Sequence, residues 1–135
     1  MLPEIWGKHA WNFIHLTIFG YPVNPSQQDK INYFNFFNDL QFVLPCDKCR
    51  FNLSQHLKKI PLTNEILSDR SLFIKWGIDL HNMVNYYTGK PILSYNKALD
   101  EINKLVNPKK SNNLFLIIMI IIVVLCIFYY LWKKS

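Results

Sequence analysis

Proline and glycine divide this chain into segments whose apolar residues recur every three or four positions, and this pattern constrains the fold more than any other feature. One segment shows it clearly. Ser26 can cap a helix, Asp29 stands where it can reach back to the cap, and apolar residues follow at helical spacing as far as Leu44. No stretch of useful length alternates apolar and polar residues as a strand would. The sequence therefore predicts an all-α fold.

Prolines, glycines and capping serines also set the expected helix boundaries. The expected helices run from Pro3 to Gly20, Pro25 to Leu44, Pro45 to Ile60, Ser68 or Ser71 to Gly89, and Ser94 to Leu105. On the fourth helix, the stripe expected to face the core is Leu72, Trp76, Leu80, Val84 and Tyr87. The segment between the third and fourth helices is expected to be a loop. We predict four main helices in an antiparallel bundle, with the short fifth helix packed across it.

A continuous apolar run occupies the C-terminal part of the chain. From Leu114 to Leu131 there is no charge, glycine or proline, and at helical rise this run is roughly 27 Å long, close to the thickness of a bilayer core. Aromatic residues and lysines at its end are typical of a membrane interface. We expect a single-pass C-terminal transmembrane helix at 114–132, with the preceding domain on the cytosolic side. The alternative is an unusually apolar core helix.

These features divide the chain into four parts. We expect a domain at 1–107, a linker at 108–113, the transmembrane helix at 114–132 and a short tail at 133–135. The net charge is +6, but the basic residues are scattered rather than gathered into a stripe, so no nucleic-acid partner is expected.

Two of the three cysteines, Cys46 and Cys49, form a C-x-x-C pair in the stretch LPCDKC. A zinc site needs further ligands at close spacing, and none of the four histidines forms a tight pair with another His or Cys, so we expect no metal. A thioredoxin-like site needs a β-α-β pattern, which is absent. Two inert buried thiols are an alternative. A redox disulfide at a helix N-terminus is favoured, because the helix dipole there stabilises a thiolate.

An oxidase also needs a cofactor that can pass electrons to oxygen, and two helices offer polar and aromatic stripes. The first stripe is Lys8, Trp11 and His15, and the second is His81, Asn82 and Asn85. Each of these residues alone is more often part of a core or a cap. Three polar residues within one and a half turns are harder to explain by packing, because buried polar groups need partners, which a bound nucleotide would supply.

Four stretches of the sequence occur in a recognisable order: WGKHAWNFIHLTIFGYP, LPCDKC, HNMVNYYTGKP and SYNKALDEI. Together they resemble the Erv/ALR family of FAD-linked sulfhydryl oxidases, which share W-x-F/L-x-H, C-x-x-C and H-N-x-V-N…K-P. The similarity covers roughly Trp6 to Leu105, and the compact form resembles the members encoded by large cytoplasmic DNA viruses. The resemblance implies a four-helix bundle with a short fifth helix, usually a homodimer, that binds FAD at the mouth of the bundle.

The resemblance also implies roles for individual residues. Cys46 would be the accessible cysteine that meets the substrate, and Cys49 the charge-transfer cysteine next to the flavin. The positions that match the family's FAD contacts are Lys8, Trp11, His15, Cys49, His81, Asn82, Val84, Asn85, Lys90 and Tyr95. Electrons would pass from a substrate dithiol through the Cys46–Cys49 disulfide to FAD and then to O2, giving hydrogen peroxide.

The sequence departs from cellular members of that family. It has no second cysteine pair to act as an internal shuttle, and Ile78 stands where many members carry a cysteine of an additional structural disulfide. We therefore expect a thiol-containing protein or a small relay thiol protein to dock at Cys46. Virion proteins would be the final clients, and a virion or virus-assembly membrane the location. The alternative is a catalytically idle, tail-anchored helical adaptor.

Overall fold

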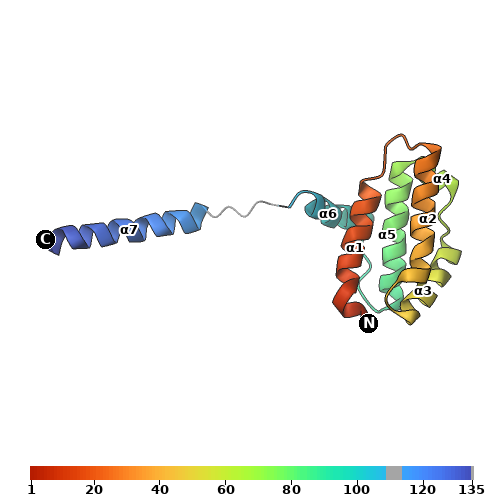
Figure 1. Ribbon diagram of the computed structural model, residues 1–135, viewed down its shortest axis with the longest axis horizontal. Helices are drawn as coiled ribbons and strands as arrows, with labels where there is room; N and C mark the ends of the chain where they lie inside the picture. The colour runs from red at the N-terminus through yellow and green to blue at the C-terminus, as the bar shows by residue number, and fades with distance from the viewer. Residues whose placement is uncertain (109–113, 135) are drawn as a thin grey trace.

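Helices make up all the regular secondary structure in residues 1–108 and 114–134, the residues described by the computed structural model of this protein (Figure 1). In chain order they are α1 (Pro3–Phe19), α2 (Gln27–Val43), α3 (Asp47–Lys59), α4 (Asn64–Ser68), α5 (Arg70–Tyr87), α6 (Tyr95–Val106) and α7 (Leu114–Lys134). The predicted all-α character of the fold is confirmed. Figure 1 shows α1, α2 and α5 side by side. Helix α3 packs against α2 and α5, and the short α6 packs against α1 and α5.

Aromatic side chains fill the centre of the bundle. Phe73 of α5 is fully buried, and its ring meets that of Phe37 of α2 edge-on, with ring centroids 5.3 Å apart. Trp76 packs against both rings. Edge-to-face pairs of this kind add to the large apolar area that each ring removes from water. The cluster therefore fixes α2 against α5.

Two predicted helix caps are confirmed. The Ser26 side chain accepts a hydrogen bond from the backbone N–H of Asp29, and the Asp29 carboxylate accepts one from the backbone N–H of Ser26, which completes a capping box at the start of α2. Ser94 caps α6 in the predicted way, through the backbone N–H of Lys97.

The entry into α5 differs from the prediction. Asp69, rather than Ser68 or Ser71, caps the helix, because its carboxylate accepts hydrogen bonds from the backbone N–H groups of Ser71 and Leu72. Ser68 instead ends the short helix α4, in a segment that we expected to be a loop. Thr63 caps that helix, and α4 persists because it places Leu67 in the core.

The buried face of α5 also differs from the expected stripe at both ends. Trp76 and Leu80 lie in the core as predicted, but Leu72 is 40% exposed and Tyr87 is 55% exposed. The buried stripe instead begins at Phe73, which the aromatic cluster draws inward. Because neighbouring helix residues point about 100° apart, Leu72 faces away from the core that Phe73 enters, and Tyr87 is the last residue of α5.

Helix α7 occupies the position of the apolar run. Within the described residues, no helix has the combination of length and apolar character that a membrane crossing requires. The predicted transmembrane helix at 114–132 is therefore wrong, as are the single-pass anchor, the membrane partner and the membrane location. The predicted linker at 108–113, apart from Pro108, and the last tail residue, Ser135, lie outside the described residues.

Candidate active site

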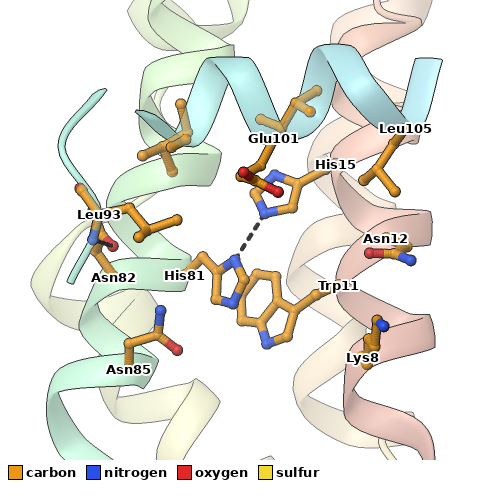
Figure 2. A pocket seen from close by; sticks show the side chains of 13 residues that line it. Lys8, Trp11, Asn12, His15, His81, Asn82, Asn85, Leu93, Glu101 and Leu105 are labelled. Atoms are coloured by element: carbon orange, nitrogen blue, oxygen red, sulfur yellow. Dashed lines mark hydrogen bonds between the residues drawn. The ribbon is translucent and has the colours of Figure 1, made fainter. Parts of the chain in front are cut away.

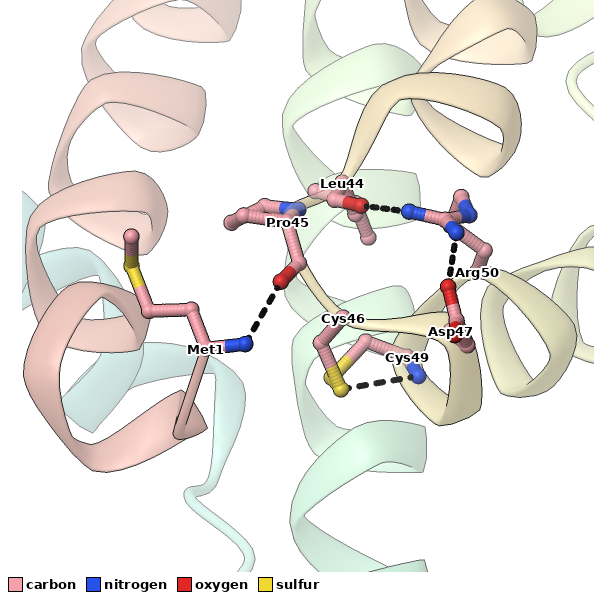
Figure 3. Close-up of a disulfide and its surroundings, with 7 residues drawn as sticks. All are labelled: Met1, Leu44, Pro45, Cys46, Asp47, Cys49 and Arg50. Atoms are coloured by element: carbon pink, nitrogen blue, oxygen red, sulfur yellow. Dashed lines mark hydrogen bonds and ion pairs between the residues drawn. A yellow bond between two sulfur atoms is a disulfide. The ribbon is translucent and has the colours of Figure 1, made fainter.

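Cys46 and Cys49 form a disulfide at the start of α3, with their Cα atoms 5.1 Å apart (Figure 3). Helix α3 begins at Asp47, so Cys46 is its N-cap. We had expected the helix to begin at Pro45, which would have placed Cys46 in the first turn. Cys46 has extended backbone, and its Sγ accepts a hydrogen bond of 3.3 Å from the backbone N–H of Cys49. Both cysteines are half-buried. The disulfide thus lies at the positive end of the α3 dipole, which stabilises a thiolate.

The loop that leads into the disulfide is held from two sides. The backbone nitrogen of Met1, beside α1, donates a hydrogen bond of 3.1 Å to the carbonyl of Pro45 (Figure 3). The guanidinium of Arg50 donates one of 2.6 Å to the carbonyl of Leu44 and forms an ion pair with Asp47. Both carbonyls that directly precede Cys46 therefore have partners.

A cavity of about 300 Å³ lies between α1, α5 and α6 (Figure 2). It brings together six residues that the sequence singled out, namely Lys8, Trp11, His15, His81, Asn82 and Asn85. The first three come from α1 and the last three from α5. The two stripes therefore line one cavity together.

Trp11 and His81 form a flat wall of this cavity. Their rings stack with centroids 4.0 Å apart and planes tilted by 9°. Figure 2 shows the two rings next to each other, one from α1 and one from α5. Such a surface suits another flat ring system.

His15 and His81 share a hydrogen bond of 2.8 Å between His15 Nε2 and His81 Nδ1. Burial lowers the pKa of His15 to about 4. Burial also lowers the pKa of His81 to about 4, with smaller effects from His15 and from the Lys90 ammonium. Both imidazoles are therefore neutral near pH 7, and one donates its N–H to the other.

The amides of Asn82 and Asn85 find partners within the protein. Asn82 exchanges two hydrogen bonds with the backbone of Leu93, of 2.9 and 3.0 Å. Asn85 Nδ2 donates to the carbonyl of Pro91 at 3.2 Å. The segment between α5 and α6 therefore supplies hydrogen bonds that we expected a bound nucleotide to provide. The two amides instead shape one side of the cavity.

Four of the predicted cofactor residues do not line this cavity, and they are Cys49, Val84, Lys90 and Tyr95. Val84 is half-buried in α5, and Tyr95 is 40% exposed at the start of α6. Lys90 is exposed on the turn after α5, where its backbone N–H donates to the Asn85 carbonyl at 2.8 Å. Among the described residues, no group of three or more His, Cys, Asp or Glu side chains is placed to hold a metal ion.

Sequence reasoning missed seven residues that line the cavity, which are Asn12, Ile78, Leu93, Ala98, Glu101, Ile102 and Leu105. Four of them lie on α6, whose apolar face was visible in the sequence as residues at helical spacing. Nothing local showed that this face closes a cavity. A signal existed for Asn12, which lies four residues after Lys8 and so on the same face of α1.

The fold and the site together define a class of protein: a small helical domain that combines a C-x-x-C disulfide at a helix N-terminus with an aromatic, histidine-lined cavity. The chain belongs to the Erv1 / Alr family, whose family model matches residues 8–104.

Relatives and solved structures agree with that assignment. The chain is 51% identical over 113 residues to a protein of Acanthamoeba polyphaga mimivirus named "Probable FAD-linked sulfhydryl oxidase", a match that covers 84% of this chain and 79% of the relative. It is 37% identical over 95 residues to a protein of Invertebrate iridescent virus 6, covering 67% of this chain and 86% of the relative. The crystal structure of the yeast Erv1 core superposes with a TM-score of 0.65 at 21% identity, covering 83% of this chain and 86% of that chain. This last likeness shows the fold.

Proposed function

We propose that this protein is an FAD-linked sulfhydryl oxidase, which forms disulfides in thiol substrates and passes the electrons to O2 to give hydrogen peroxide. The observation that carries the proposal is the presence, in one small helical domain, of a half-buried C-x-x-C disulfide and a cavity walled by the Trp11–His81 stack. Membership of the Erv1 / Alr family supports it. So does the name of the mimivirus relative.

The cavity has the chemistry that FAD requires. Trp11 and His81 offer a flat face for a ring system, Lys8 offers a cation for a phosphate, and Asn85 offers a polar edge. A volume of about 300 Å³ lies at the lower end of ligand pockets and accommodates one end of a dinucleotide. When bound, FAD supplies an acceptor for two electrons that O2 can reoxidise.

We assign the binding of FAD to the residues that match the family's contacts. Those that line the cavity are Lys8, Trp11, His15, His81, Asn82 and Asn85. Cys49, Val84, Lys90 and Tyr95 are the others, and they would contact parts of the dinucleotide that lie outside the cavity. The oxidase domain that these residues define is residues 1–107.

The cysteines perform the thiol chemistry. A substrate thiolate attacks Cys46 Sγ, the Cys46–Cys49 bond breaks, and its electron pair leaves on Cys49 as a thiolate. A second substrate thiolate then attacks the mixed disulfide, so that the substrate disulfide forms and Cys46 leaves as a thiolate. The substrate has lost two protons to solvent and two electrons to the cysteine pair. The α3 dipole favours each leaving thiolate.

The partners that we propose are a thiol-containing protein or small relay thiol protein, O2 and a second copy of the chain. The exposed apolar residues Phe13 and Leu16 on α1 support a homodimer, because apolar side chains that are exposed in one copy can be buried in a dimer. Viral relatives support the further prediction that virion proteins are clients.

The full chain, purified with added FAD, tests the proposal. We expect a yellow protein that consumes oxygen and produces peroxide when dithiothreitol is supplied. Cys49→Ser should retain FAD and lose turnover, whereas Cys126→Ser, which removes the free exposed cysteine of α7, should keep both. A folded, colourless protein without oxygen uptake would instead support an idle adaptor and refute the proposal.

A further inference from the structure

Arg50 contacts the chain on both sides of Cys46 (Figure 3). One guanidinium nitrogen donates to the carbonyl of Leu44 at 2.6 Å, and another forms an ion pair with the Asp47 carboxylate. The backbone N–H of Arg50 donates to the carbonyl of Cys46 at 2.9 Å. Arg50 therefore binds the residue two before Cys46, Cys46 itself and the residue after it.

These contacts join the end of one helix to the start of the next. Leu44 is the C-cap of α2, so its carbonyl has no partner within that helix, and a cation there also complements the dipole. Asp47 lies in the first turn of α3, where a carboxylate is favourable. The Arg50 side chain is 36% exposed, whereas that of Asp47 is 92% exposed. Leu44 is half-buried whereas Asp47 is exposed, so the contact with the Leu44 carbonyl is the better shielded of the two.

Only a guanidinium can make this arrangement. Its planar fork donates in two fixed directions at once, whereas an ammonium is a point charge on a flexible stem. The fork reaches the Leu44 carbonyl and the Asp47 carboxylate together. It therefore restricts the segment that carries Cys46 as well as placing a charge nearby.

We propose that Arg50 is a positioning residue for the redox pair, holding the Cys46 segment against α3 so that Cys46 Sγ stays within bonding reach of Cys49 Sγ. The inference rests on the proposed function for its role in turnover. In each cycle the pair gains two electrons as its S–S bond breaks and two thiolates form, and the bond must close again when the electrons leave. Restricting the segment raises the effective concentration of one sulfur at the other, which favours the closed disulfide.

Two substitutions separate position from charge. Arg50→Lys keeps the charge and loses the fork. Arg50→Gln loses both, and loss of a cation alone would disfavour the thiolates and make the pair harder to reduce. If positioning dominates, both variants make the pair easier to reduce. Lys48→Gln is the matched control, because Lys48 is exposed and makes no side-chain hydrogen bond or ion pair among the described residues.

The measurement is equilibration of the full chain, as purified and with oxygen excluded, in dithiothreitol redox buffers, with the fraction of reduced Cys46–Cys49 read by thiol alkylation and mass shift. We expect the equilibrium constant for reduction to rise about fivefold in Arg50→Lys, or about 20 mV at roughly 30 mV per tenfold change. Arg50→Gln should shift in the same direction, and Lys48→Gln should stay within about twofold of the wild type or shift the opposite way.

Outcomes of this experiment are independent of the oxidase proposal, because alkylation reports the disulfide without requiring oxygen uptake. Wild-type behaviour in Arg50→Lys, or a shift of Arg50→Gln toward harder reduction, would overturn the positioning role. An equal shift in Lys48→Gln would also overturn it. If one Arg50 variant loses its helical circular dichroism, the other decides the question.

Discussion

His15 of α1 and His81 of α5 join their helices through a hydrogen bond of 2.8 Å between two imidazoles, and Trp11 stacks on the second of them. Because burial lowers the pKa of each histidine from 6.5 to about 4, the folded protein holds both rings neutral over a pH range in which free histidines are charged. This contact links the stability of the cavity to pH.

The first prediction is that acid destabilises the fold through this pair. Between about pH 6.5 and pH 4 the unfolded chain binds more protons than the folded chain, so the free energy of unfolding falls as the pH drops through that window. Above about pH 6.5 the two histidines no longer make the free energy of unfolding depend on pH. The expected loss is roughly 3 kcal/mol for each histidine at most. Urea unfolding at several pH values measures it. His81→Gln should remove about half of the contribution of this pair, and the pH dependence that remains includes that of His56, whose pKa burial also lowers. An unchanged profile in His81→Gln would contradict the assignment.

The second prediction concerns the wall of the cavity. Trp11→Leu removes the ring that stacks on His81 and so removes the flat surface offered to FAD. We expect FAD affinity to fall about fivefold, because aromatic stacking contributes about 1 kcal/mol. Quenching of flavin fluorescence on titration measures the affinity. Phe13→Leu is the control, since Phe13 is 59% exposed and lies outside the cavity lining. Equal affinities for the two variants would place FAD elsewhere.

A third prediction tests the connection between α5 and the segment before α6. Asn82→Asp keeps the shape of the side chain but replaces the group that donates to the Leu93 carbonyl with an acceptor. The loss of this bond and the repulsion between two oxygens should lower the free energy of unfolding by about 1–3 kcal/mol. Urea unfolding at pH 7 gives the value. Asn35→Asp, on an exposed position of α2, should change it by less than about 0.5 kcal/mol. A similar loss in both variants would show that Asn82 contributes no special contact.

Features encoded within one helix could be predicted from the sequence. Ser26 with Asp29, and Ser94, are caps whose partners lie within three residues, so their roles follow from local spacing. Trp11 and His15 are also one turn apart on α1. That Trp11 meets His81 could not be read from spacing, because the contact depends on how α1 packs against α5.

Features decided by tertiary packing were predicted less well. Ser68, Asp69 and Ser71 can all cap a helix, and the presence of α4 decides in favour of Asp69. At the start of α5 the core cluster takes in Phe73 rather than Leu72, the residue that periodicity favoured. On α6, Glu101 lies in the cavity lining because α6 packs against α1 and α5, which no local pattern records.

The last prediction tests how closely α1 packs against α5. Gly77 is buried where a Cβ atom would overlap Cδ1 of Ile18, a side chain that is 2% exposed. Gly77→Ala gains about 1 kcal/mol of helix propensity, but overpacking a closed core costs about 1–3 kcal/mol, so a net loss of about 1 kcal/mol is expected. Ile18→Val removes the overlapping methyl group. In that background Gly77→Ala should be neutral or stabilising, giving a coupling of about 1–2 kcal/mol in a double-mutant cycle of urea unfolding. Additive effects of the two substitutions would mean that the Ile18 side chain moves aside at this point without cost, and would refute the overpacking.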